Sequence, residues 1–296
     1  MRKTGFVAIV GRSNAGKSTL LNSLIRQKVS IVSPKPQTTR DNILGIWTDE
    51  DSQIVFVDTP GELTARNALG EYMVRNISEA IVDVDCVMLV LDGHNGIGDI
   101  ELSLVKKYAT GKIPLVVVVS KIDISQPEKI MPTLVKLNEC QGIAEVYCVS
   151  AKKNKGIDEL KTALKKYLKG TELYFEEDDV TDKPARFLVC EIIREKALLL
   201  LEDEVPYGIG VALNKMEFNE ETHEWDIDAN ILVNKSAHKG IILGKGGSMI
   251  KEIGTSARIS MEKMLESKVY LSLWIKVKED WRDSQFILNE LGYSNK

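Results

Sequence analysis

The sequence predicts an α/β domain with a doubly wound, mostly parallel sheet, followed by a smaller α+β domain. Over the first half, short β-branched apolar segments alternate with amphipathic ones, as in parallel sheets covered by helices. A glycine-rich GxxxxGKS motif at Gly11–Ser18 joins the first such pair. The alternation stops near Lys169, and 296 residues exceed the roughly 100–200 residues of a typical domain. We therefore expect two domains.

Five segments of the first half are short and almost continuously apolar, as expected of strands buried on both faces. They are residues 5–10, 53–58, 85–92, 114–120 and 144–150. Three amphipathic segments, residues 18–27, 70–83 and 156–169, fit crossover helices. The first domain is therefore predicted to span residues 1–169.

A linker is predicted over residues 170–183, which contain Gly170 and the acidic run Glu176–Asp179. The order of elements then changes. The remaining residues, 184–296, predict a small α+β domain with few strands. Its expected elements are a helix at 191–203, paired strands at 207–218 and 224–234, helices at 247–253 and 259–265, and a strand at 269–278.

Composition describes an ordinary folded protein, with 44% hydrophobic and 28% charged residues. The net charge of −4 gives no global attraction to nucleic acid or anionic lipid, so any polyanion site must be local. Between Lys235 and Arg282, ten basic residues face five acidic ones, a local charge of +5. Such an asymmetry would focus a polyanion on the second domain.

Cellular location is predicted from three features. The four cysteines show no CxxC spacing and are expected to be reduced thiols. The start of the chain is not typical of a secretory signal. The longest apolar run, Ile113–Val119, is far shorter than the ~20 residues of a spanning helix. We therefore expect a cytoplasmic protein.

The GxxxxGKS motif lies directly after a predicted strand and before a predicted helix, the setting that a phosphate-binding loop requires. Its glycines let backbone N–H groups surround the β-phosphate, Lys17 neutralises the β- and γ-oxygens, and Ser18 ligates Mg²⁺. Downstream, Asp58-Thr59-Pro60-Gly61 forms a DxxG at a strand end. Asp58 is expected to hold Mg²⁺ through water, and the Gly61 N–H to meet the γ-phosphate.

Two further motifs follow strands, and they resemble the base-reading loops of GTPases. Ser120-Lys121-Ile122-Asp123 resembles NKxD, whose aspartate accepts hydrogen bonds from the guanine N1–H and exocyclic amine. Ser150-Ala151-Lys152 resembles the SAK loop, whose backbone N–H meets the guanine O6. Four motifs in order, each at a strand end, favour GTP as ligand.

Together these motifs resemble the TRAFAC translation-factor-like GTPases, and the segment Pro36–Ile46 resembles the switch I of their Era group. The resemblance implies binding and slow hydrolysis of GTP to GDP, with Lys17, Thr39 and Gly61 as catalytic groups. It implies Ser18, Thr39 and Asp58 as Mg²⁺ ligands, and Asn14 as either a K⁺ ligand or a loop-closing residue. The expected nucleotide contacts are Gly11, Arg12, Ser13, Asn14, Ala15, Gly16, Lys17, Ser18, Thr19, Asp58, Thr59, Pro60, Gly61, Ser120, Lys121, Asp123, Ser150, Ala151 and Lys152.

The second domain resembles a type II KH domain, and its GxxG loop is Gly244-Lys245-Gly246-Gly247. This resemblance covers essentially the whole chain. It implies binding to the 3′ end of small-subunit (16S) ribosomal RNA, a role in maturation of the 30S subunit, a monomer, and peripheral attachment to the inner face of the plasma membrane. The expected RNA contacts are Lys239, Ile242, Gly244, Lys245, Gly246, Gly247, Lys251 and Arg258.

Three features depart from the Era-group pattern. Ser120 replaces the asparagine of NKxD, so we expect the hydrogen bond that ties the base loop to the P-loop to be shortened or lost. Glu62 follows the DxxG where relatives carry a hydrophobic residue, and its charge would repel the γ-phosphate unless the side chain points away. Residues 62–67 lack the usual His-Lys-Pro stretch.

Two alternatives remain from the sequence. One is a passive GTP-binding interaction protein, suggested by Ser120 and Glu62 and distinguishable by single-turnover hydrolysis. The other is a tRNA-modifying GTPase, suggested by Asn14 but lacking a cysteine in the catalytic motif of such enzymes.

Overall fold

The computed structural model describes residues 2–294, which divide into two compact units. The first unit contains the chain up to Val32, Thr39–Thr64 and Met73–Asp182, and the second contains Ser33–Thr38, Ala65–Tyr72 and the chain from Lys183 onward. Two short segments of the N-terminal half therefore group with the C-terminal unit.

The first unit is built on a six-stranded sheet with the order β2-β3-β1-β4-β5-β6. The strands are β1 (Lys3–Val10), β2 (Ile43–Thr48), β3 (Ser52–Asp58), β4 (Cys86–Asp92), β5 (Leu115–Ser120) and β6 (Ile143–Cys148). All neighbouring strands are parallel except β2 and β3. The predicted doubly wound, mostly parallel sheet is confirmed, and β2 is the antiparallel strand that the sequence analysis did not predict.

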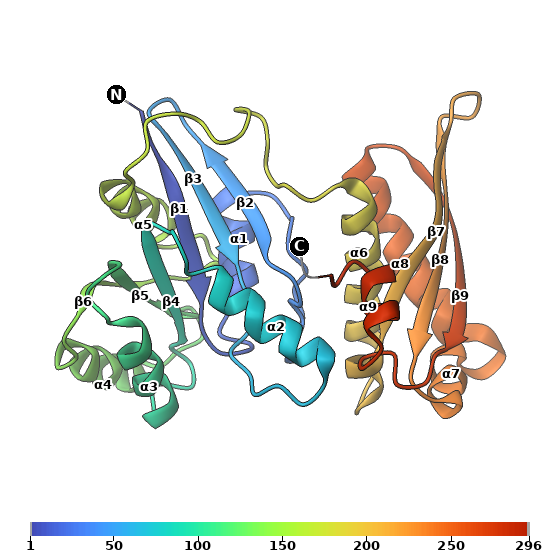
Figure 1. Ribbon diagram of the computed structural model, residues 1–296, viewed down its shortest axis with the longest axis horizontal. Coiled ribbons are helices and arrows are strands. Elements are labelled where there is room, and N and C mark those ends of the chain that lie inside the picture. Colours follow the sequence, from blue (N-terminus) through green and yellow to red (C-terminus); the bar gives the residue numbers. More distant parts are fainter. Residues whose placement is uncertain (1, 295–296) are drawn as a thin grey trace. The chain divides into compact units, whose positions relative to one another are not determined.

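The helices of this unit are α1 (Lys17–Ile25), α3 (Asp99–Tyr108), α4 (Pro127–Asn138), α5 (Ile157–Leu164) and the 3₁₀ turn η1 (Lys165–Tyr167). Helix α2 (Ala68–Glu79) belongs to this unit from Met73 onward. In Figure 1, α1 lies behind the sheet. Every residue of β3 and β5 is buried, as expected of strands covered on both faces. The carboxyl ends of β1, β3 and β5 lead into the predicted motifs.

The second unit is an α+β domain with a three-stranded sheet of order β7-β8-β9 (Figure 1). Strands β7 (Gly210–Asn219) and β8 (Glu224–Val233) are antiparallel, whereas β8 and β9 (Lys268–Val277) are parallel. The helices are α6 (Ala185–Leu200), α7 (Ser236–Leu243), α8 (Ser248–Leu265) and α9 (Gln285–Glu290), with 3₁₀ turns η2 (Val205–Gly208) and η3 (Lys245–Gly247). The predicted fold class of this domain is confirmed.

Four helices in this unit differ from the prediction, and one of them, α9, was not predicted at all. The two helices predicted at 247–253 and 259–265 are one continuous helix, α8 (Ser248–Leu265), because Ile253, Ala257 and Met261 recur every four residues and are all fully buried. Helix α6 begins six residues earlier than predicted. Helix α7 was not predicted either, since only His238 and Ile242 of its eight residues are buried and its apolar pattern is weak.

Each unit has its own hydrophobic core. The core of the second unit joins α6 and α8 to the inner face of the three strands, with Ile193, Ile231 and Met261 fully buried. Within residues 2–294, no helix combines the length and apolar character needed to cross a membrane.

Candidate functional site

The P-loop connects the end of β1 to the start of α1, and its backbone requires glycine at two positions. Gly11 has φ of 144° and Gly16 has φ of 98°, both unfavourable for other residues. A Cβ on Gly11 would also lie 2.4 Å from the carbonyl oxygen of Val90. The loop therefore opens α1 with its first N–H groups directed toward one point, as phosphate binding requires.

Lys17 is the first residue of α1 and is buried. Its Nζ donates to the carbonyl oxygens of Gly11 (3.1 Å) and Arg12 (3.0 Å), so the ammonium lies inside the loop. Burial lowers the pKa of Lys17 to about 8, although the charges of Asp58 and Glu62 oppose this shift. A phosphate in the loop would supply the counter-charge that the buried ammonium needs.

The three predicted Mg²⁺ ligands meet in one place. Ser18 Oγ donates to Asp58 Oδ2 at 2.7 Å and lies 2.9 Å from Thr39 Oγ1. Asp58 Oδ2 also accepts a hydrogen bond from Ser30 Oγ at 2.8 Å. Asp58 Oδ1 is buried and has no hydrogen-bond partner among the described residues. Hydroxyl and carboxylate oxygens with one unused acceptor fit a hard divalent cation such as Mg²⁺.

The DxxG segment leaves β3 and packs against the P-loop. Thr59 Oγ1 donates to the carbonyl oxygen of Ile9 at 2.8 Å, and Pro60 is buried. A Cβ on Gly61 would lie 2.5–2.7 Å from the Oγ, N and Cα atoms of Ser13, so no other residue fits this position without a shift. The backbone of Gly61 therefore lies beside the phosphate-binding loop.

Ser120 ends β5 and contacts the P-loop. Its hydroxyl lies 2.6 Å from the carbonyl oxygen of Ala15 and 3.0 Å from that of Leu91. Of the two expected outcomes, a shortened or a lost link, loss does not occur, because the shorter side chain still reaches the loop. Lys121 Nζ adds a second link by donating to the carbonyl oxygen of Asn14 at 2.7 Å.

Asp123 and Ser150 join the two base-reading loops. Ser150 Oγ donates to Asp123 Oδ1 at 2.6 Å and accepts from the backbone N–H of Lys153 at 3.1 Å. The Ser150 hydrogen bond lowers the pKa of Asp123, which keeps this exposed carboxylate charged. A charged acceptor here suits the two donors on the guanine edge.

An open pocket of about 490 Å³ is lined by residues of α1 and of the SAK loop, so this loop lies next to the helix that follows the P-loop. Thr19 and Ala151 both line it, whereas the neighbouring Lys152 is exposed. All the predicted nucleotide contacts thus lie in the first unit, at the carboxyl ends of β1, β3, β5 and β6, in the loops that follow these strands, or in the first turn of α1.

The GxxG loop forms the turn between α7 and α8. Gly244, Gly246 and Gly247 have φ of 71°, 61° and 80°, so the loop conformation depends on glycine. A Cβ on Gly246 or Gly247 would meet nothing within 4 Å, which leaves this face of the loop open. Lys245 between them is exposed.

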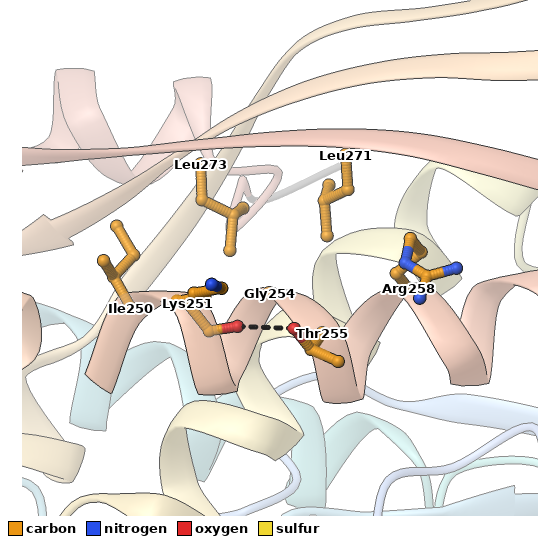
Figure 2. A pocket seen from close by; sticks show the side chains of 7 residues that line it. All are labelled: Ile250, Lys251, Gly254, Thr255, Arg258, Leu271 and Leu273. Carbon is orange, nitrogen blue, oxygen red and sulfur yellow. Dashed lines mark hydrogen bonds between the residues drawn. The ribbon is translucent and has the colours of Figure 1, made fainter. Parts of the chain in front are cut away.

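A groove with a volume of about 290 Å³ runs between α8 and β9 in the second unit (Figure 2). Leu271 and Leu273 extend from β9 toward α8, and the small side of Gly254 keeps the groove open between them. Lys251 and Arg258 stand on α8 at the groove. Arg258 is braced by Glu262, with an Nη1 to Oε1 distance of 2.7 Å. The groove offers an apolar floor with cationic groups on one side.

Ile242 is a correction to the predicted RNA contacts. Its side chain is fully buried in the core of the second unit, so it supports α7 and does not reach an RNA. Lys239, one turn of α7 earlier in the chain, is exposed as expected.

Some residues of these sites were not identified from the sequence. Asp92 forms an ion pair with Lys121 at 2.8 Å, and its position at the end of β4, in register with Ser120, could have indicated this. Ser30 carries no motif that would reveal its contact with Asp58. Leu271 and Leu273 lie in the strand predicted at residues 269–278, but the sequence analysis gave them no role in a site.

The geometry defines a class of protein: a P-loop GTPase joined to a KH domain. Two family models agree. Residues 6–121 match the model described as 50S ribosome-binding GTPase, and residues 204–282 match the KH domain model.

Curated relatives narrow the class further. The chain is 48% identical over 295 residues to the GTPase Era of Clostridium botulinum (strain Hall), covering 100% of this chain and 99% of the relative. It is 46% identical over 293 residues to the GTPase Era of Clostridium acetobutylicum, covering 99% of this chain and 98% of the relative. The chain belongs to the Era family of GTPases.

Solved structures of Era agree over the full length. A crystal structure of Era in complex with MgGDPNP and nucleotides 1506–1542 of 16S ribosomal RNA has a TM-score of 0.94 and 37% identity and covers 100% of both chains. A variant of Aquifex aeolicus Era bound to GDP·AlF4⁻ gives the same TM-score and identity over 99% of this chain and 100% of that chain. The enzyme described here hydrolyses GTP, as its family membership shows.

Proposed function

We propose that this GTPase is an RNA-binding switch that recognises the 3′ end of 16S ribosomal RNA and acts in maturation and assembly of the 30S subunit. The observation that carries the proposal is the groove between α8 and β9, whose lining begins at Ile250, three residues after the GxxG loop. The Era structure with nucleotides 1506–1542 of 16S ribosomal RNA supports the same target.

In this proposal the nucleotide site works as follows. The P-loop N–H groups and Lys17 bind the β- and γ-phosphates, and Ser18, Thr39 and Asp58 hold Mg²⁺ directly or through water. Bound Mg²⁺ would neutralise charge that develops on the phosphate oxygens. The Gly61 N–H meets the γ-phosphate, Asp123 reads guanine, and Ser150 orients Asp123. The proximity of Ser18, Thr39 and Asp58 supports the metal assignment.

The RNA site would combine two kinds of contact. The open face of Gly246 and Gly247 admits a sugar-phosphate chain close to the backbone, while Lys245, Lys251 and Arg258 supply positive charge. The apolar floor formed by Leu271 and Leu273 suits unstacked bases. These features favour single-stranded RNA over a duplex.

Two alternatives lose their support. The hypothesis of a passive GTP-binding protein was based on Ser120 and Glu62. However, Ser120 keeps its hydrogen bond to Ala15, and the Glu62 side chain points away from the P-loop toward α3. The hypothesis of a tRNA-modifying GTPase was based on Asn14 alone, and the full-length similarity to Era favours the Era family instead.

We propose K⁺ as an additional cofactor at Asn14, whose φ of 64° is held by the P-loop turn. Hydrolysis should then be faster in K⁺ than in Na⁺ for the wild type, and equal in both for Asn14→Ala.

We further propose that the protein acts in the cytoplasm as a monomer. Peripheral membrane attachment stays a prediction, which sedimentation with anionic vesicles would test.

The RNA proposal is tested by charge reversal in the GxxG loop. Lys245→Asp should weaken binding of a single-stranded 3′-end RNA by at least about tenfold while GDP affinity stays unchanged, because a phosphate contact is replaced by repulsion. Lys268→Asp, an exposed lysine of the second unit outside the groove, is the matched control. Equal RNA binding by both variants and the wild type would reject the KH site.

A further inference from the structure

We propose that Lys107 and Tyr108 of α3 are positioning residues that hold the Glu62 carboxylate away from the γ-phosphate of GTP. This inference rests on the proposed contact between Gly61 and the γ-phosphate, and it explains how this chain tolerates an acidic residue next to its DxxG motif.

The backbone of Glu62 is fixed beside the P-loop. Its N–H donates to the carbonyl oxygen of Gly11 at 3.1 Å, and the preceding Gly61 leaves no room for a Cβ against Ser13. The main chain therefore cannot retreat from the phosphate site. The position of the Glu62 charge depends on its side chain alone.

The side chain is directed to the last turn of α3. Glu62 Oε1 accepts a hydrogen bond from Lys107 Nζ at 2.8 Å and a short one from the Tyr108 hydroxyl. Tyr108 is 5% exposed, and Lys107 Nζ lies 5.0 Å from the centre of its ring, so the two donors also contact each other. Burial and the Glu62 charge raise the pKa of Tyr108, which keeps the phenol protonated as a donor.

The consequence concerns discrimination between GTP and GDP. A carboxylate released from α3 would face the γ-phosphate across the Gly61 backbone and repel it, whereas the β-phosphate lies deeper in the P-loop. Losing the α3 donors should therefore weaken binding of GTP more than binding of GDP. Removing the Glu62 charge as well should cancel the effect.

The test measures affinities for a non-hydrolysable GTP analogue and for GDP with Mg²⁺ present. Lys107→Met/Tyr108→Phe should lose about tenfold or more in affinity for the analogue and less than twofold for GDP. Adding Glu62→Leu should restore the wild-type ratio. Lys106→Met, which removes the charge of the exposed neighbouring lysine, is the matched control and should behave as the wild type. Tyr108→Phe alone, which keeps the buried ring, should show a smaller loss in the same direction.

An unchanged ratio of the two affinities in the double variant, or a loss that Glu62→Leu does not repair, would overturn the inference. Gly61→Ala separates this failure from failure of the proposed γ-phosphate contact, since its Cβ would displace the loop from Ser13. If Gly61→Ala lowers the ratio of GTP-analogue affinity to GDP affinity and the α3 variants do not, only the inference on α3 is wrong. If Gly61→Ala leaves the ratio unchanged, the proposed γ-phosphate contact is wrong.

Discussion

At the residue scale, Ser120 shows that a serine hydroxyl can replace the longer side-chain amide of asparagine. It is 4% exposed and lies at hydrogen-bond distance from two backbone carbonyl oxygens, one of them in the P-loop. The link between the base loop and the phosphate loop thus survives the exchange of asparagine for serine. Nucleotide affinity should depend on this hydroxyl.

Ser120→Ala should lower the affinities for GDP and for a GTP analogue equally, by roughly 2- to 10-fold, the equivalent of one neutral hydrogen bond of about 0.5–1.5 kcal/mol. Fluorescent-nucleotide titration would measure both. Ser103→Ala, which removes an exposed hydroxyl of α3, should change neither affinity. An unchanged affinity in Ser120→Ala would show that the link carries no binding energy.

Lys17 gives a pH-dependent prediction for protein freed of nucleotide and Mg²⁺. Its pKa is about 8 in the folded protein and 10.5 in the unfolded chain. Between these values the unfolded chain keeps a proton that the folded protein has released, so the free energy of unfolding rises with pH, by about 1.4 kcal/mol per unit. Below pH 8 the contribution is constant.

Denaturant titrations of the wild type and Lys17→Met from pH 7 to 10 would measure this slope. Because the variant lacks the titrating group, the difference between the two free energies should be flat below pH 8 and should rise above it in favour of the wild type. Parallel curves over the whole range would show that Lys17 is not desolvated.

Residue-level prediction from the sequence succeeded where a motif fixes a backbone shape and failed where tertiary contacts decide. The P-loop, DxxG and GxxG patterns located Gly11, Gly61 and Gly247 because glycine is needed for their conformation or packing. The direction of the Glu62 side chain depends on α3, about forty residues later in the chain, and no local pattern reveals it. Ile242 was misassigned because its exposure depends on which face α7 turns to the core.

At the scale of elements, α8 performs two tasks with opposite faces. Ile253, Ala257 and Met261 are fully buried in the core, while Lys251, Gly254 and Arg258 line the groove. The sequence predicted two short helices here, at residues 247–253 and 259–265. The continuous helix is stabilised by packing along its whole inner face.

Gly254→Leu tests the groove as a binding element. A Cβ at this position would lie 3.5 Å from Leu273 Cδ1, an ordinary contact, and the rest of the side chain would occupy the groove. Because the helix propensity of leucine is more favourable than that of glycine by about 0.8 kcal/mol, thermal stability should stay equal or rise. Affinity for single-stranded RNA should fall by at least about tenfold, measured by fluorescence anisotropy.

The control for this variant is binding of GDP, which should remain at the wild-type value because the nucleotide site lies in the other unit. RNA affinity unchanged by Gly254→Leu would mean that bases do not enter the groove, and the RNA would then be held by the GxxG loop alone.

At the scale of the whole molecule, the division of the chain into units suggests how nucleotide state reaches the RNA site. Ser33–Thr38 and Ala65–Tyr72 group with the C-terminal unit. Thr39, which follows the first segment, and Gly61, four residues before the second, belong to the GTPase unit. Within the C-terminal unit, the buried Arg194 of α6 donates to the carbonyl oxygen of Thr38 at 2.5 Å and pairs with Glu191. The proposed switch would use this continuous stretch of chain, since Thr38 and Thr39 are consecutive residues assigned to different units.

The central claim is that bound nucleotide controls RNA binding. The most direct test measures the affinity for a single-stranded RNA copying the 3′ end of 16S ribosomal RNA, with the protein loaded with GDP or with a non-hydrolysable GTP analogue at one salt concentration. We predict tighter binding in the analogue state by roughly 5-fold or more, the usual scale of coupling between two sites. Equal affinities in the two states would contradict the switch and leave two independent binding sites on one chain.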